Sequence, residues 1–256
     1  MKYLISILFC ALLMGAFAQS KPKSLKRKGA LPAYFGVEVR PVFPSKFLGE
    51  TYLELESQGF VTTLTQKPGY GFGGIVRAGI TKLIAFESGI NFTRRNFDLT
   101  MELADSNSYA EDQLGFIEYA VPINGLFYIQ LSKELFMNAS IGVAITYQPT
   151  DIGVVNQPGG LHTYRHTGLT REKVGASLNA DLGFEYRTKK QGFFYLGGSA
   201  RVPFAPLFDL VADWEYQGNF IRVDGPVDGS FLSIDLKYFF PIVRNKGPQP
   251  ELGPLQ

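Results

Sequence analysis

The chain has 256 residues, of which 45% are hydrophobic and 14% aromatic, and it contains 28 glycines. This apolar content excludes a globally disordered chain, and the many aromatics and glycines favour strands joined by tight turns. Charged residues make up only 19% and the formal net charge is +2, so bulk charge gives no case for a nucleic-acid partner.

The first segment has the features of an export signal. A short positive start precedes an apolar run from Tyr3 to Ala16, and Ala16-Phe17-Ala18 is a small-x-small cleavage site. We predict a signal peptide over residues 1–18, followed by a basic leader over 19–33. The single cysteine, Cys10, lies inside the apolar run, so the mature chain would have no disulfide, no thiolate catalysis and no Cys-ligated zinc.

The rest of the chain shows repeated period-2 alternation, which predicts β-strands. In Leu135–Tyr147 every odd position is apolar, whereas most even positions are small or polar, and Val174–Arg187 repeats the pattern. Most of the segments reach the length of about 9–11 residues that a tilted strand needs to cross a bilayer. The eight predicted strands cover residues 34–43, 69–80, 84–100, 114–131, 135–147, 174–187, 193–204 and 229–240.

The connections between these segments alternate in length. Three are short, and the other four are long: Pro44–Pro68, Glu102–Gln113, Gln148–Lys173 and Ala205–Asp228. Long-short alternation is typical of an up-and-down barrel with tight turns at one end. We therefore predict an all-β fold, an eight-stranded antiparallel up-and-down transmembrane β-barrel over residues 34–240, with a Pro-rich periplasmic tail over 241–256.

Alternation alone does not separate a membrane barrel from a soluble, lipocalin-like one, because the two face opposite ways. Lys237 is the only lysine in the predicted strands, and the polar face is rich in Gly, Ser, Asn and Ala, which suits a narrow interior. Charges in a low-dielectric interior need partners, and the polar face carries six acids and six bases. We predict that these twelve residues form an ion-paired plug: Glu38, Glu87, Glu118, Asp181, Glu185, Asp235, Arg40, Arg77, Arg95, Arg187, Arg201 and Lys237.

Aromatic residues gather near the predicted strand ends and are typical of the girdles at membrane interfaces. We assign to these girdles Tyr34, Phe35, Tyr70, Phe72, Tyr147, Tyr186, Phe193, Phe194, Tyr238, Phe239 and Phe240.

The long connections carry the remaining candidate residues. The fourth connection is too apolar for a solvated loop; it either extends the neighbouring strands or forms a binding surface, in which case Trp214, Tyr216 and Phe220 are the candidate partner contacts. His162 and His166 have a spacing that would suit metal binding on a helix, but a third ligand and a helical pattern are missing. With no nucleophile elbow or phosphate loop, we expect no catalytic residues, metal or cofactor.

Two segments resemble a known family. Phe116–Tyr128 is similar to the "YxEIPxLLKY" strand of the PorT-like outer-membrane β-barrel family, and Ser230–Phe240 resembles its final strand, although Ala120 and Asn124 interrupt the expected apolar run. The resemblance implies an outer-membrane barrel of a Gram-negative bacterium. The closing aromatics resemble the signal that the barrel-insertion machinery reads.

Three hypotheses of function follow. The leading one is a non-enzymatic structural or binding protein of the outer membrane, in contact with outer-membrane lipid, which meets a protein partner through its extracellular loops or assists a secretion or surface-assembly complex. The alternatives are a narrow channel or transporter for a small solute and a lipid-modifying enzyme.

Overall fold

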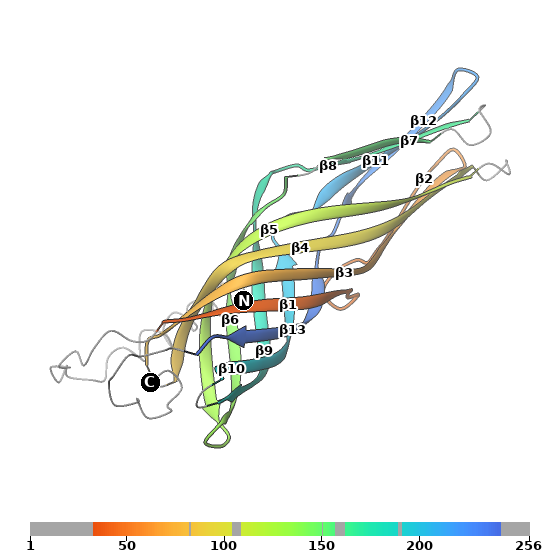
Figure 1. Ribbon diagram of the computed structural model, residues 1–256. Coiled ribbons are helices and arrows are strands. Elements are labelled where there is room, and N and C mark those ends of the chain that lie inside the picture. Colours follow the sequence, from red (N-terminus) through yellow and green to blue (C-terminus); the bar gives the residue numbers. More distant parts are fainter. Residues whose placement is uncertain are drawn as a thin grey trace, which may run out of the picture. The chain divides into compact units, whose positions relative to one another are not determined.

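The computed structural model describes residues 33–81, 83–103, 109–149, 151–156, 162–188 and 191–241 (Figure 1). The predicted signal peptide, the leader up to residue 32 and the tail beyond residue 241 lie outside the described residues. The regular structure within them is entirely antiparallel β-sheet, so the predicted all-β antiparallel class is confirmed. In these ranges we find no helix that is long and apolar enough to cross a membrane.

Eight strands form a continuous series of hydrogen-bonded neighbours. Starting from β1, the pairings run through β3, β4, β5, β6, β9, β10 and β13, and β13 pairs with β1 again. These strands correspond to the eight predicted segments. Their bounds are β1 Ala33–Pro44, β3 Phe60–Gly79, β4 Ile84–Leu103, β5 Tyr109–Gln130, β6 Leu135–Tyr147, β9 Val174–Arg187, β10 Phe193–Pro203 and β13 Phe231–Phe239.

The predicted number of strands was wrong, because the described residues contain thirteen. The five additional strands lie in segments that were expected to be long connections, and β3, β4 and β5 also continue into those segments. They are β2 Tyr52–Ser57, β7 Ile152–Asn156, β8 Thr163–Leu169, β11 Phe208–Tyr216 and β12 Asn219–Val227.

A bulge explains why β3 is longer than predicted. Pro68 and Gly69 break the alternation in the sequence, which is why the predicted strand began there. In the structure the β3–β4 ladder shifts register between Lys67 and Tyr70, and pairing then continues to Phe60. A bulge inserts residues without ending a strand, so the interruption bends β3 rather than terminating it.

Four of the additional strands build a second sheet, ordered β12-β11-β8-β7, whereas β2 pairs with β3 at the edge of the first sheet. The inner face of the second sheet packs against the far parts of β3, β4 and β5, and we call this two-sheet region the extension; its strands reach away from the tight turns in Figure 1. Phe116 of β5 stacks on Phe208 of β11 with ring centroids 3.8 Å apart, and Phe97 meets Phe208 edge-on at 5.6 Å. The extension therefore has a hydrophobic core of its own.

The opposite end is made of tight turns that are capped by hydroxyl side chains. Thr81 Oγ1 accepts from Ile84 N at 3.0 Å, and Ser132 Oγ accepts from Leu135 N at 3.1 Å. Thr188 Oγ1 accepts from Gln191 N at 2.8 Å. The start of β1 and the end of β13 pair close to these turns, so both lie at the tight-turn end, as an even number of crossings requires.

Candidate functional site

The series of eight strands places charged side chains on its inner side and apolar ones on its outer side. In β1, Glu38 is only 3% exposed, whereas its neighbours Val37 and Val39 are 48% and 53% exposed. Because side chains alternate along a strand, one register decides the facing of the whole ladder. Eleven of the twelve predicted interior charges are buried, and Asp181 is half-buried.

The first interior cluster centres on Arg77, which binds two glutamates. Its Nε donates to Glu87 at 2.8 Å, and its Nη1 donates to Glu185. Lys237 Nζ also donates to Glu87, at 2.7 Å, and Arg187 Nε donates to Glu185, at 2.5 Å. Each carboxylate therefore contacts two cations, which compensates the cost of burying its charge.

Aromatic rings enclose this cluster from the tight-turn end. The Arg187 guanidinium lies 4.4 Å from the Phe136 ring centroid and 5.0 Å from that of Phe193, and Arg77 lies 4.0 Å from that of Phe239. Cations over ring faces gain electrostatic stabilisation, and the rings exclude water from the ion pairs.

Three aromatic residues that were predicted to lie in the outer girdles point inward instead. Tyr34 and Phe193 are each 7% exposed, and their ring centroids lie 4.6 Å apart inside the series of strands; Phe239 is fully buried. The adjacent residues Phe35 and Phe194 are 61% and 47% exposed. Consecutive aromatics in a strand cannot share a face, so the assignment of both members of such pairs to an outer girdle was wrong.

A second cluster lies where the interior meets the extension. Arg95 donates through Nη2 to Glu118 and through Nη1 to the carbonyl of Gly229 at 2.7 Å. Arg201 Nη1 contacts the same glutamate at 3.4 Å, and its Nε donates to Asn179 at 3.1 Å. Glu118 of β5 therefore binds one cation from the neighbouring strand β4 and one from β10, which does not pair with β5.

The remaining interior charges have partners on the same strand or on the neighbouring strand. Arg40 pairs with Glu38 on the same strand, and Ser233 Oγ donates to Asp235 at 2.8 Å. Asp181 accepts from a serine of β6. The cavity among these side chains measures about 20 Å³, which is the scale of a single water molecule. Among the described side chains, this cavity therefore has room for about one water.

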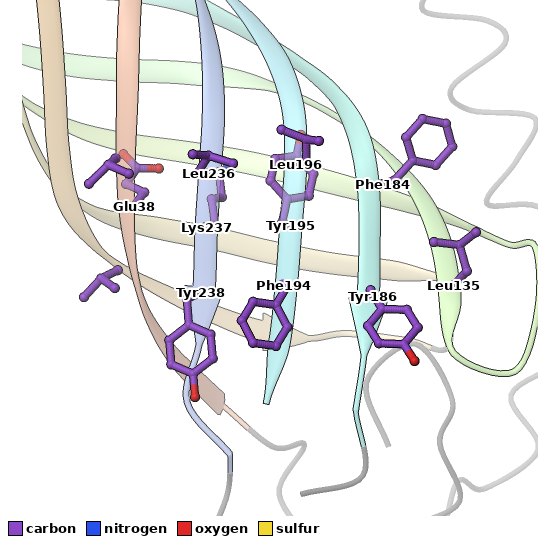
Figure 2. Close-up of a pocket in the computed structure, with 12 residues that line it drawn as sticks. Glu38, Leu135, Phe184, Tyr186, Phe194, Tyr195, Leu196, Leu236, Lys237 and Tyr238 are labelled. Carbon is purple, nitrogen blue, oxygen red and sulfur yellow. The ribbon is translucent and has the colours of Figure 1, made fainter. Parts of the chain in front are cut away.

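The outer face of the eight paired strands is largely apolar, and a row of aromatic side chains borders it near the tight turns. Near the tight turns, Tyr186, Phe194 and Tyr238 lie side by side on β9, β10 and β13, as Figure 2 shows. Tyr238 Oη donates to the Gln191 carbonyl and Tyr186 Oη donates to Glu134, both at 2.9 Å. Their polar ends thus reach the turns while their rings line an apolar outer hollow of about 430 Å³.

The three predicted partner contacts differ in exposure. Phe220 is 51% exposed, Tyr216 is half-buried, and Trp214 is only 5% exposed. The Trp214 indole packs in the extension core and donates to His162 Nδ1 at 3.2 Å. Trp214 therefore offers little surface to a partner. The segment does not extend β10 or β13 but forms the hairpin β11–β12 of the second sheet, and its apolar side chains lie in the core of the extension.

The two histidines have separate environments. The His162 ring stacks on Tyr216 with centroids 4.4 Å apart, whereas His166 is 1% exposed and its Nε2 lies 3.4 Å from the Asp112 carboxylate. In a strand, a spacing of four residues corresponds to roughly 13 Å. His166 is a buried link between β8 and β5, a role that the sequence pattern did not indicate.

We predict that His166 makes the extension less stable in acid. Burial lowers the pKa of His166 below its ordinary value of 6.5, and Asp112 opposes this only in part. The unfolded state therefore takes up a proton at a higher pH than the folded state does, so stability is lost as the pH falls below about 6.5. Protease protection of the extension should decrease from pH 8 to pH 5 in the wild type and less in His166→Gln. Identical pH profiles would contradict the assignment.

The comparisons with known proteins place few limits on this chain. No protein-family model matches it, and neither does any curated protein. Among solved structures, the outer membrane protein OprG from Pseudomonas aeruginosa is similar, with 13% identity and a TM-score of 0.48, over 83% of this chain and 98% of OprG. A likeness at this level assigns neither a family nor an activity.

Proposed function

We propose that this chain is an outer-membrane β-barrel with a filled, ion-paired interior, which acts as a structural or binding protein through the extension. The observation that carries the proposal is the facing of the eight paired strands. Apolar side chains such as Ile90 and Leu182, 67% and 57% exposed, point outward, while charged side chains point inward and neutralise one another. In water this arrangement would expose a large apolar surface, whereas in a bilayer it satisfies both faces.

The dimensions of the outer band support insertion. From Tyr119 to Phe127, β5 rises roughly 27 Å along the strand at about 3.4 Å per residue. A strand tilt of about 40° reduces this to roughly 21 Å along the membrane normal, close to the apolar band of about 25 Å in outer-membrane barrels. Tyr119 and Phe127 are 44% and 53% exposed, as residues at two membrane interfaces should be.

The orientation follows from the connections. Short turns face the periplasm in this class of barrel and longer segments face outward, so the extension would lie outside the cell. We propose a relationship to the PorT-like family, because Phe116–Tyr128, which lies in β5, and Ser230–Phe240 around β13 resemble strands of that family.

The extension is the part suited to a partner. It is ordered by its own core, and Phe220 stands exposed on β12, next to the hairpin that joins β11 to β12. A rigid, sheet-based platform positions contact residues with less entropy loss than a flexible loop does. The filled interior favours this role over solute transport, because it leaves space for about one water.

Heat modifiability tests the proposal. The full chain, expressed with its signal segment, should fractionate with the outer membrane, require detergent to stay in solution, and migrate differently on gels before and after boiling. Extraction without detergent, or unchanged migration on boiling, would contradict a membrane barrel. Stable conductance across a planar bilayer would contradict the filled interior and favour the channel alternative.

A further inference from the structure

An aromatic patch lies on the outer face where the apolar band meets the extension. It is formed by Tyr70 and Phe72 of β3, Phe92 of β4 and Tyr119 of β5. The Phe92 ring centroid lies 6.2 Å from that of Tyr70, 4.8 Å from that of Phe72 and 5.7 Å from that of Tyr119. Tyr70, Phe72 and Tyr119 are 48%, 51% and 44% exposed. The patch is therefore continuous across three strands.

Arg94 is the next outward residue of β4 beyond this patch, and it is exposed. It pairs with Tyr70 on one side and with Ile117 on the other. Arg94 Nε donates to Asn96 Oδ1 at 3.2 Å, and Asn96 Nδ2 donates in turn to the carbonyl of Pro68 at 2.9 Å. The β3 bulge thus supplies a backbone acceptor that orients Asn96, and Asn96 orients Arg94.

Gly115 of β5 leaves room for the Arg94 guanidinium. A Cβ atom at position 115 would lie 2.9 Å from Arg94 Nη2 and 3.1 Å from its Nε. The guanidinium therefore lies over the neighbouring strand in space that a larger residue would fill. Its position is defined on two sides, although the side chain is exposed.

Arg94 differs from the other arginines on the outer surface of the described residues. Arg165, Arg171 and Arg222 each form an ion pair with a nearby carboxylate, as does Lys67 with Asp98. Among the described residues, Arg94 has no carboxylate partner, and nothing accepts from its two Nη groups. Arg94 is therefore held in place by its neighbours, and its two Nη groups are available to donate hydrogen bonds to a ligand.

We propose that Arg94 binds the phosphate of an anionic membrane lipid whose acyl chains cover the aromatic patch. A guanidinium donates two parallel hydrogen bonds to a phosphate, a geometry that lysine does not reproduce. Aromatic residues at a membrane interface lie at the headgroup level, so the patch places the donors at the depth of lipid phosphates. This inference rests on the proposed membrane barrel and adds a lipid-binding site to it.

Native mass spectrometry of the full chain in mild detergent tests the site. The probes are phosphatidic acid and phosphatidylcholine with the same acyl chains, and inorganic phosphate. We expect the wild type to retain phosphatidic acid in preference to phosphatidylcholine, and Arg94→Gln to weaken phosphatidic acid binding about tenfold. Lys133→Gln, which removes an exposed cation in a turn at the opposite end, is the matched control and should bind as the wild type does.

A second variant distinguishes loss of the lipid site from a folding defect caused by the loss of charge. Gly115→Val keeps every charge but occupies the place of the guanidinium, and it should weaken phosphatidic acid binding several-fold. Equal binding by the wild type and Arg94→Gln, or capture of inorganic phosphate as tight as capture of the lipid, would overturn the proposal. Heat modifiability of each sample separates this failure from failure of the barrel, because a heat-modifiable wild type without lipid preference refutes only the site.

Discussion

Replacing Ile141 with arginine should prevent most of the chain from inserting into the membrane. Ile141 lies in the middle of β6, is 57% exposed on the outer face, and pairs with Gly125 and Ala180 on the two neighbouring strands. An arginine at the bilayer midplane of a barrel costs about 2–4 kcal/mol. The mature protein should then shift from the outer-membrane fraction to aggregates or degradation products, as measured by fractionation and heat modifiability.

Ile141→Met is the control, since it changes the shape of the side chain but keeps it apolar, and it should insert normally. A charge on the inner face of the same strand should be less harmful: Asn138→Lys, which places an ammonium beside Glu185, should still insert. Equal insertion of Ile141→Arg and Ile141→Met would mean that this face does not meet hydrocarbon, and the facing of all eight paired strands would have to be reversed.

The period-2 pattern explains why the eight paired strands were predictable. Leu135–Tyr147 and Val174–Arg187 have the same bounds in the structure as in the sequence prediction. In such segments hydrophobicity and strand geometry have the same period, and long runs leave one register that buries the charged face. The same reasoning fails where neighbours are alike: it placed both Phe193 and Phe194 in a girdle, although only Phe194 faces outward.

The extension was harder to predict because local signals there are weak. Its hairpins turn at Gln58-Gly59 and Gln217-Gly218, and all four of these residues have positive φ. Two-residue hairpin turns of this kind usually begin with Asn, Asp or Gly, so a Gln-Gly pair is a weak sequence signal for a hairpin. Three of the four strands that they join, β2, β11 and β12, have nine residues or fewer. Their apolar side chains are buried only because a second sheet from distant sequence covers them.

The interior charges could be identified from the sequence, but their partners could not. Period 2 places Arg77, Glu87 and Glu185 on one face, yet Glu185 is 108 positions from Arg77 and meets it only across the interior. Which carboxylate each cation reaches depends on the stagger of the strands, and no local pattern encodes that stagger. Positioned outer residues such as Arg94 were missed for the same reason, since Gly115 and Asn96 define its place only after β4 and β5 have paired.

Removing the Arg77 guanidinium should destabilise the eight paired strands more than removing any exposed ion pair. Arg77→Met keeps much of the volume but leaves Glu87 with only Lys237, and Glu185 with only Arg187. Breaking a buried pair typically costs about 3–5 kcal/mol, because the remaining charge is neither solvated nor fully paired. The urea midpoint of the folded, heat-modifiable form in detergent should therefore fall clearly below that of the wild type.

Two further variants decide whether charge is the cause. Arg171→Met breaks an exposed pair with Asp209 and should cost less than about 1 kcal/mol. In the Arg77→Met background, Glu185→Gln should cost less stability than it does in the wild type, because one of the two cations that bind Glu185 is already absent, and a double-mutant cycle measures that coupling. If Arg77→Met and Arg171→Met had the same midpoint, or if Glu185→Gln added a further loss equal to its loss in the wild type, the interior pairs would not be what holds these strands together.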